Sequence, residues 1–371
     1  MDYQKSSRRT FLGNLGRLAV GLTFLPLVGC EDNAFAPVIE GVDIPFLTPN
    51  DEFYVQFGAN AGVANWQGAP TISRDDWHLR IDGLVGNPFS LNLSDLATEE
   101  PQTVLATLRC IVDANNVPGL VGTAAWTGIP LRVFLDRAGL NPDRVRRLRI
   151  YGADGFTDNL TLDKLYGDRP DDLIEPMLVY DMNGQPLTPA HGAPVRLLVP
   201  GHYGHKSIKW IERIEATDDD SVFGTYQNAL GFTDDGVIRV VNKPTNILRG
   251  AQIDSGTTRI SGFALSGYAG IQRVEVAIDG GAFVEARLMP LSEIDSTDPN
   301  LALALQQQDP KRFTYPYRGV WALWDYWWKA ASGEHTISVR ATDASGNTQP
   351  ESDPDATDGN NPVFAVNVLV K

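Results

Sequence analysis

Cysteine is scarce in this chain, and long apolar runs are absent from most of it. Only Cys30 and Cys110 occur among its 371 residues, and no Cys-x-x-Cys-His sequence is present, which excludes a covalently attached c-type haem. Beyond residue 30 no apolar run approaches the roughly 20 residues that a membrane-spanning helix needs. Basic residues number 31 against 46 acidic ones, for a net charge of −15. This acidity argues against nucleic acid and favours polar or cationic partners, including small-molecule substrates.

Residues 1–30 have the composition of an export signal rather than of a folded domain. Arg8 and Arg9 lie side by side ahead of an apolar run over 18–28, which Pro26 interrupts. The run is too short to span a membrane as a helix. Paired arginines in this position predict a twin-arginine signal, which exports proteins that fold before they cross the membrane. An ordinary basic segment of a signal peptide is the alternative.

The end of this segment predicts a lipid anchor. Residues 27–30, Leu-Val-Gly-Cys, match a lipoprotein signal in which Cys30 is acylated and becomes the mature N-terminus. Each buried CH₂ of an acyl chain contributes about 0.8 kcal/mol, so several chains would hold the protein on a membrane surface. A plain signal peptide with a cysteine near its end is the alternative. We therefore expect an exported protein, periplasmic or at the cell surface, that is anchored through Cys30.

Export with acylation would leave Cys110 as the only thiol of the folded protein. A single thiol in an oxidising compartment has no disulfide partner. Cys110 is then either an inert buried side chain, the more common state of a lone cysteine, or a ligand held for a metal, because thiolates are soft donors. The residue types alone leave both interpretations open.

The rest of the chain divides by its patterning into a tether and two domains. Residues 31–47 contain proline and aspartate with little periodicity and are predicted to form the tether. Residues 48–245 mix strands with short helices, as expected of an α+β domain. The patterns predict strands at 77–83, 194–201 and 208–216 and a short helix at 131–138.

Residues 250–371 have an all-β pattern. Apolar residues alternate with polar ones in short runs, and the runs end in turns rich in Gly, Asp and Asn. Strands at this spacing predict an immunoglobulin-like sandwich. A polar, Gln-rich insertion at 291–312 interrupts the pattern, and no structure is predicted for it. The expected architecture is an α+β domain followed by an all-β sandwich.

Several motifs occur in an order that is specific as a set. They are 48–55, 108–110, 125–131, 180–187, 191–196 and 209–210, followed by Trp321, Trp324, 340–343 and 346–347. On these residues the chain resembles the sulfite oxidase family of molybdenum-cofactor enzymes, over residues 45–371. The resemblance implies a molybdenum-cofactor catalytic domain at 48–245 and an immunoglobulin-like dimerisation domain at 250–371.

The resemblance also implies a site. Cys110 would ligate the molybdenum of a pyranopterin (molybdopterin) cofactor, and the metal would deprotonate the thiol. The cofactor carries a phosphate, which needs cationic and N–H donors. From the residues alone, Arg196 and Lys209 could also be solvated charges on strand faces. The implied cofactor contacts are Tyr54, Val55, Gln56, Asp154, His191, Arg196, Ser207, Ile208 and Lys209.

Three positions depart from the pattern of sulfite-oxidising members, which surround the metal with arginines and a tyrosine. Gln56 replaces an arginine, Asp113 falls in the segment that is basic in those members, and Phe232 aligns with the tyrosine. We therefore predict Cys110, Gln56, Asp113 and Phe232 as the catalytic set. Gln56 brings no positive charge and Asp113 would add a negative one. A neutral or cationic substrate is predicted in place of the sulfite dianion.

Two further histidines, His202 and His205, lie in one loop with His191 nearby. A separate zinc site is an alternative for them, but their spacing is not that of a zinc motif and no second cysteine completes it. We expect them to line the cofactor pocket or its rim.

The expected activity is oxygen-atom transfer, with electrons exchanged through a separate protein such as a cytochrome. One alternative is a sulfite dehydrogenase that uses an external cytochrome, for which Arg109 is the nearest cation. A metal-free binding protein on the same fold is another. The resemblance implies a homodimer, and the residues themselves leave a monomer open.

Overall fold

The computed structural model describes residues 43–56, 69–113, 119–167, 169–294, 297–353, 355 and 357–371. The predicted export signal, Cys30 and most of the predicted tether lie outside these residues. The described end of the tether is packed against the protein. Phe46 and Leu47 are buried, and the Phe46 carbonyl accepts a hydrogen bond of 2.9 Å from Trp321 Nε1.

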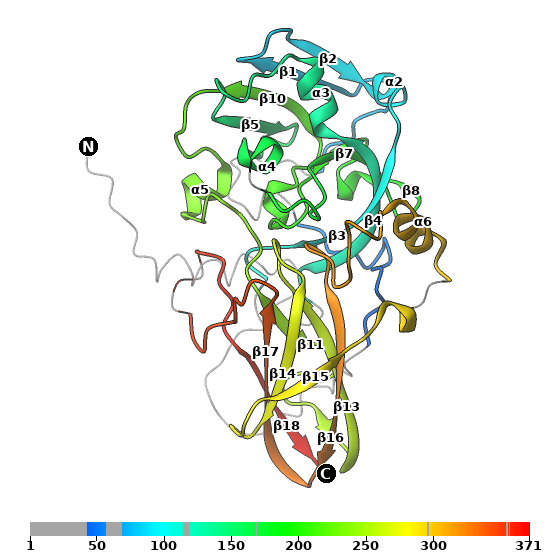
Figure 1. Cartoon of the computed structure of the whole chain (residues 1–371), viewed down its shortest axis with the longest axis vertical. Coiled ribbons are helices and arrows are strands. Elements are labelled where there is room, and N and C mark those ends of the chain that lie inside the picture. The colour runs from blue at the N-terminus through cyan, green and yellow to red at the C-terminus, as the bar shows by residue number, and fades with distance from the viewer. Residues whose placement is uncertain are drawn as a thin grey trace, which may run out of the picture.

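The N-terminal part, cyan to green in Figure 1, contains two sheets. In the first sheet the strand order is β2 (Phe89–Asn92), β1 (His78–Gly83), β10 (Ile211–Thr217), β5 (Arg147–Gly152) and β6 (Thr157–Thr161). The second is formed by β3 (Gln102–Arg109), β4 (Val121–Pro130), β7 (Met177–Met182) and β8 (Gln185–Pro186), with β9 (Arg196–Leu198) paired to β7.

Short helices connect these strands: α2 (Leu93–Leu96), α3 (Leu131–Arg137), α4 (Asp163–Tyr166), α5 (Thr225–Leu230) and the 3₁₀ turns η2 (Pro189–His191) and η3 (Gly204–Lys206). The helix predicted at 131–138 is confirmed as α3. Its apolar residues Leu131, Phe134 and Leu135 are buried, and Gly139 follows it with φ of +68°, as expected of a residue that ends a helix.

The C-terminal part, yellow to red in Figure 1, is the expected all-β sandwich. Its strands follow the order β11 (Val241–Pro244), β13 (Gly256–Leu265), β16 (Ala322–Ala330), β15 (Val284–Leu288), β14 (Ile271–Ile278), β17 (Gly333–Asp343), β18 (Phe364–Val370) and β12 (Gln252–Ile253). Because β11 pairs with β13, this sheet begins inside the range assigned to the cofactor domain. The domain limits stay a prediction.

The insertion at 291–312 carries helical structure that the sequence pattern did not indicate. It contains the 3₁₀ turn η4 (Leu291–Glu293) and helix α6 (Pro299–Gln307). Asp298 caps α6 by accepting hydrogen bonds from the backbone N–H groups of Asn300 and Leu301, the usual role of Asp at this position. The helix buries Leu301 and Ala304, so the insertion is part of the core.

Strands β3 and β4 form the centre of the molecule. Nearly every residue of both is buried, because apolar clusters cover both faces of the sheet. One of these clusters joins the two parts of the chain, with Leu105 and Tyr203 on one side and Phe263 and Trp321 on the other. Cys110 directly follows β3, so the packing of this buried strand fixes its position.

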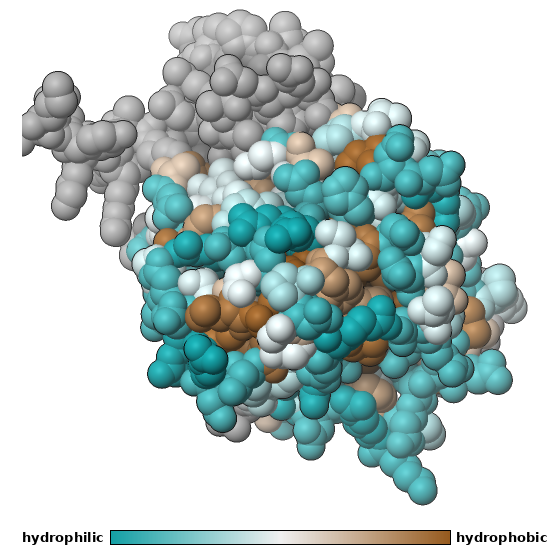
Figure 2. All heavy atoms as spheres, turned by 90° about the horizontal axis from the view of Figure 1, so that it is seen from above, coloured by the Kyte–Doolittle hydropathy of each residue, from teal (hydrophilic) through white to brown (hydrophobic). Residues whose placement is uncertain are grey.

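The outer surface has a different character. Seen from above in Figure 2, it is mostly hydrophilic, and small apolar patches are separated by polar side chains. Among the described residues no helix has the length and apolar character needed to cross a bilayer.

A buried charge cluster ties the end of β3 to the C-terminal sheet. Arg109 Nε lies 3.0 Å from Asp113 Oδ2, and Lys243 Nζ of β11 lies 2.8 Å from the same oxygen. The second oxygen, Asp113 Oδ1, accepts a 2.8 Å hydrogen bond from the Leu120 N–H. All three charged side chains are at most 4% exposed. Asp113 thus fixes both ends of the turn that contains Cys110.

We expect Asp113→Asn to destabilise the protein strongly. The substitution would remove the carboxylate that the buried Arg109 and Lys243 share, and removal of one member of a buried ion pair costs about 3–5 kcal/mol. Urea unfolding followed by tryptophan fluorescence would measure the loss. Glu293→Gln is the control, because Glu293 pairs with Arg287 where both side chains are 48% exposed, and it should cost about 1 kcal/mol or less. Equal effects of the two variants would contradict the prediction.

Candidate active site

A pocket opens beside Cys110, and all of its lining residues come from the N-terminal part. It encloses about 640 Å³, including its opening to solvent. Its walls come from the segment before residue 57, the end of β3, the turn after β5, the loop between β9 and β10, and α5. The lining residues are Phe53, Tyr54, Gln56, Leu108, Cys110, Asp154, Phe156, Arg196, Gly204, His205, Ser207, Ile208, Lys209, Trp210 and Tyr226.

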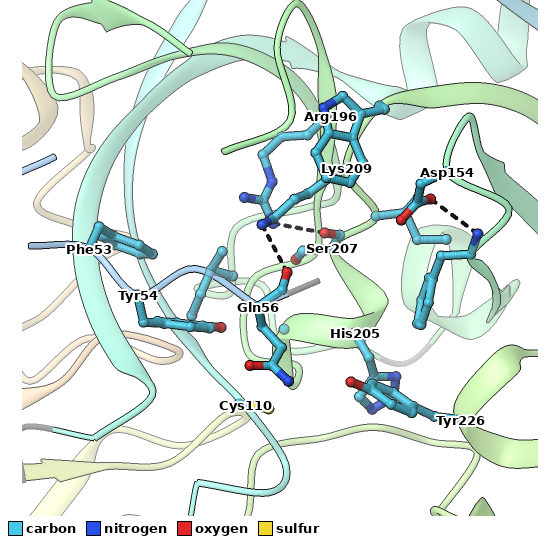
Figure 3. A pocket seen from close by; sticks show the side chains of 15 residues that line it. Phe53, Tyr54, Gln56, Cys110, Asp154, Arg196, His205, Ser207, Lys209 and Tyr226 are labelled. Atoms are coloured by element: carbon cyan, nitrogen blue, oxygen red, sulfur yellow. Dashed lines mark hydrogen bonds between the residues drawn. The ribbon is translucent and has the colours of Figure 1, made fainter. Parts of the chain in front are cut away.

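One end of the pocket is cationic. Figure 3 shows Arg196 and Lys209 together at this end, near Ser207 and Asp154. Arg196 donates to the carbonyls of His191, at 3.1 Å, and Ser207, at 2.8 Å, and its buried Nε has no partner among the described residues. Lys209 Nζ donates to the carbonyls of Gln56, at 3.0 Å, and Ala190, at 2.7 Å. These partners are carbonyl groups, which carry no full negative charge.

The pKa values reflect this arrangement. Burial lowers the pKa of Arg196 to about 10. Burial, and then the charge of Arg196, lowers the pKa of Lys209 to about 7, although Asp154 acts in the opposite direction. Two buried cations placed together favour an anionic ligand, because its charge would offset the desolvation of both.

The other end of the pocket, at Cys110, has no Lys, Arg, Asp or Glu side chain among its described lining residues. Figure 3 shows the Gln56 side chain extending toward Cys110, with Tyr226 and His205 beyond it. Gln56 forms a side-chain hydrogen bond with Tyr226, whose pKa is raised chiefly by burial. The pKa of Tyr54 is likewise raised chiefly by burial, with a smaller contribution from Cys110. Both phenols therefore stay neutral and can donate hydrogen bonds.

Close packing shapes this end. A Cβ added to Gly204 would lie 2.5 Å from the Tyr54 hydroxyl, so only glycine lets this loop approach the tyrosine. At the cationic end a Cβ on Gly192, whose φ is +100°, would lie 2.9 Å from Lys209 Cβ. The two glycines therefore permit contacts that position the polar groups of the pocket.

Cys110 itself is 5% exposed, and burial, followed by weaker influences that include Asp113, raises the pKa of its thiol to about 11. A metal cation beside the sulfur would reverse this effect, since a coordinating thiol is deprotonated. Among the described residues no group of three or more His, Cys, Asp or Glu side chains could hold a metal ion. A cofactor would supply a metal at Cys110 with donors that the described side chains do not offer.

These observations fit a molybdenum–pyranopterin cofactor. The soft sulfur of Cys110 suits the metal. The cationic end, with the unpaired Arg196 Nε, suits the phosphate of the pterin. Ser207 and Ile208 line the wall between them. The residues present thus match the chemistry of each end of such a group.

Most of the residues predicted from the sequence meet in this pocket. Val55 and His191 do not line it. His191 supports the site from behind, because its Nε2 hydrogen-bonds the Asn50 carbonyl at 3.0 Å, and burial lowers its pKa to about 4. The predicted residues that do line the pocket are Tyr54, Gln56, Cys110, Asp154, Arg196, Ser207, Ile208 and Lys209.

Two predicted catalytic residues need correction. Asp113 does not line the pocket, and its carboxylate is paired with Arg109 and Lys243. Phe232 is also outside the lining. Its ring packs edge-on against Tyr226, with centroids 5.5 Å apart, so it acts behind the wall and not in it.

Tyr226 is the functional candidate that the sequence reasoning missed. It lies in α5, where the residues around it carry no motif, and alignment to the nearby Gly-Phe pair directs attention to Phe232. A tyrosine does lie near Cys110, although from a different position than the one sought.

Comparisons with known proteins agree with the site. Residues 66–223 match the family described as the oxidoreductase molybdopterin binding domain, and residues 235–370 match the Mo-co oxidoreductase dimerisation domain. The chain is 30% identical to sulfite oxidase of Gallus gallus over 344 residues, which cover 83% of this chain and 69% of that protein. The chain belongs to the sulfite oxidase family of molybdenum-cofactor oxidoreductases. It is thus a molybdopterin-dependent enzyme, and the C-terminal match supports a homodimer.

Other relatives mark the breadth of the family. Nitrate reductase [NADH] 1 of Oryza sativa subsp. japonica is 27% identical over 82% of this chain, which spans only 36% of that protein. The sulfane dehydrogenase SoxCD from Paracoccus pantotrophus has a similar structure, with a TM-score of 0.68 and 22% identity, covering 90% of this chain and 85% of that one. This likeness confirms the fold, a cofactor domain followed by a β-sandwich. Substrates differ among these relatives, so the family does not determine the substrate.

We expect Lys209→Met to stabilise the cofactor-free protein at pH 7. The pKa of Lys209 is lowered in the folded state, so the cost of burying its charge is present in full below about pH 7 and disappears as the pH rises toward 10.5. The stability of the unmodified protein should therefore approach that of the variant between pH 7 and pH 10. Urea unfolding of both proteins across this range measures the difference.

The control is Lys164→Met. Lys164 has a raised pKa, because Tyr268 and Asp163 outweigh its burial. Its charge therefore contributes stability over the same pH range, and the variant should be less stable than the unmodified protein. The same sign of change in both variants would contradict the interpretation of the cationic end.

Proposed function

We propose that this enzyme transfers an oxygen atom to or from a neutral substrate, such as a sulfoxide or N-oxide pair, at a molybdenum ligated by Cys110. When bound, the molybdenum cofactor supplies the two-electron oxygen-atom chemistry. Arg196 and Lys209 would hold its phosphate, and Tyr54, Gln56 and Tyr226 would orient the substrate through neutral hydrogen bonds. The aromatic side chains of Phe53, Phe156 and Trp210, which line the pocket, would limit the access of water.

The observation that carries the substrate assignment is the charge around Cys110. At that end the described lining residues are tyrosine, glutamine and histidine side chains and apolar groups, and none of them is Arg or Lys. The sequence segments 57–68 and 114–118 contain no Lys, Arg or His that could add a cation. A sulfite dianion would lose its water there without an Arg or Lys to pair with, at a cost of several kcal/mol. A neutral oxide avoids this cost.

Sulfite oxidation remains the second candidate because of the 30% identity with sulfite oxidase. It needs a cation at the metal, for which Arg109 is the nearest in sequence. Arg109 is engaged with Asp113 through Nε and Nη2 and is not among the lining residues. This engagement favours the neutral substrate.

Assays of the cofactor-loaded enzyme should separate the two candidates. With an artificial electron donor or acceptor, we expect turnover of at least one member of a panel of sulfoxides and N-oxides, or of the corresponding thioethers and amines. We expect a value of kcat/KM for sulfite that is at least about 10²-fold lower, corresponding to one lost buried ion pair. Efficient sulfite turnover would refute the substrate assignment.

Cys110→Ser tests the metal ligand. Because a hydroxyl is a harder and less readily deprotonated donor than a thiol, we expect activity to vanish and the molybdenum content to fall. Metal and pterin analysis of protein matured through its own export route measures this. Cys30→Ser is the matched control and should keep both activity and molybdenum. A metal-free binding protein would instead lose little of its ligand binding in either variant.

We further propose that the enzyme is exported by the twin-arginine route, is anchored through an acylated Cys30 and exchanges electrons with a separate protein such as a cytochrome. The motifs of residues 1–30 support the first two points. The absence of a haem-attachment sequence supports the third. We also expect a homodimer. Sedimentation of protein lacking residues 1–30 should give the mass of a dimer, twice that of the monomer, whereas the monomer mass would contradict this expectation.

A further inference from the structure

A buried histidine in the pocket wall has one nitrogen without a partner. His205 is 7% exposed and lines the pocket. Its Nδ1 lies 2.7 Å from Asp158 Oδ2. Its Nε2 is buried, and none of the described residues offers it a hydrogen bond. A buried polar atom without a partner is unfavourable unless a ligand completes it.

The second histidine of the same loop shows what a structural role looks like. His202 is also buried, and both of its ring nitrogens are engaged. Nδ1 lies 3.0 Å from the Pro200 carbonyl, and Nε2 lies 3.2 Å from the Tyr268 hydroxyl. His202 does not line the Cys110 pocket. The lack of a hydrogen-bond partner for His205 Nε2 among the described residues is therefore not a general property of the histidines in this loop.

Asp158 is built to hold His205 in one orientation. The carboxylate is fully buried and also accepts hydrogen bonds from Lys206 Nζ at 2.8 Å and Gln227 Nε2 at 3.0 Å. Burial alone would raise the pKa of Asp158, but Lys206 and His205 hold it below its usual value. An ionised Asp158 fixes a proton on His205 Nδ1 and leaves Nε2 to exchange a proton with the pocket, the arrangement of a general acid–base histidine.

His205 lies at the Cys110 end of the pocket. Its ring packs edge-on against Tyr226, with centroids 5.6 Å apart, and Tyr226 hydrogen-bonds Gln56 and interacts electrostatically with Cys110. Figure 3 shows His205 on the side of Tyr226 and Cys110, away from Arg196 and Lys209. A ligand of Nε2 therefore belongs to the substrate end and not to the phosphate end.

We propose that His205, oriented by Asp158, is a catalytic residue that hydrogen-bonds the substrate oxygen through Nε2 and exchanges a proton with it. This inference rests on the proposed function. Reduction of a neutral oxide follows RO + 2H⁺ + 2e⁻ → R + H₂O, with the electrons supplied by the external electron-transfer protein. His205 Nε2 supplies one proton, and the other comes from solvent. In the oxidation of R by water, Nε2 accepts one of the two protons released.

The first test compares His205→Gln with His202→Gln in the full-length, cofactor-loaded enzyme, assayed on dimethyl sulfoxide and trimethylamine N-oxide. Glutamine keeps a polar group but cannot transfer a proton. For His205→Gln we expect unchanged molybdenum and pterin content, a loss in kcat of about 10²–10⁴-fold and a KM within about threefold of the unmodified enzyme. His202→Gln should retain kcat within about threefold.

Two outcomes would overturn the inference in this test. Loss of molybdenum or pterin from His205→Gln would make His205 a cofactor contact, and an unchanged kcat with molybdenum present would give it no catalytic role. Neither outcome affects the proposed function. An unmodified enzyme without molybdenum, or one that turns over sulfite alone, would instead overturn the proposed function.

The second test needs no substitution in the protein that is measured. Ring-nitrogen NMR signals of the five histidines are recorded on unmodified, cofactor-loaded protein with and without dimethyl sulfoxide, and His205→Gln serves only for assignment. We expect the His205 Nε2 signal to move toward the protonated position, since the sulfoxide oxygen can only accept a hydrogen bond, while the His202 signals stay. An unmoved His205 signal overturns the inference by itself.

Discussion

The site depends on one buried carboxylate. Asp113 lies between Arg109, which ends β3, and Lys243 of β11 in the C-terminal sheet, and it also accepts a hydrogen bond from the Leu120 N–H. The turn with Cys110 is thereby fixed to both parts of the chain. Because the three side chains are shielded from solvent, each charge needs its partner to offset the cost of burial. The same ion pairs that secure the turn also hold the Arg109 side chain outside the pocket lining.

The pocket separates charge by position. Arg196 and Lys209 lie at one end, where burial depresses the pKa values of both, and the other end, at Cys110, is lined by phenol, amide and imidazole groups. The cationic end can bind a phosphate whatever the substrate is. In the proposed function, the end at Cys110 determines which substrate can approach the metal. Members of one family can therefore share a cofactor and differ in substrate, because the two functions use different residues.

The sequence predicted the fold and much of the site. Local patterns sufficed for α3, because its apolar spacing and Gly139 are properties of a few neighbouring residues, and motif order sufficed for Cys110, Arg196 and Lys209. The prediction that Asp113 adds a negative charge to the site leaves out its partner Lys243, which is distant along the chain. Tyr226 was missed because α5 carries no motif. The pattern reports neighbours in sequence, while charge compensation and pocket walls are set by tertiary contacts.

The state of Cys110 also relates the cofactor to folding. Burial raises the pKa of the thiol to about 11, and burial disfavours the charged forms of Arg196 and Lys209. A cofactor that brings a metal cation to the sulfur and a phosphate to the basic residues relieves both effects. Its binding free energy therefore adds to the stability of the fold. A protein built in this way gains from receiving its cofactor before it leaves the compartment where the cofactor is made, which agrees with the proposed export of a folded enzyme.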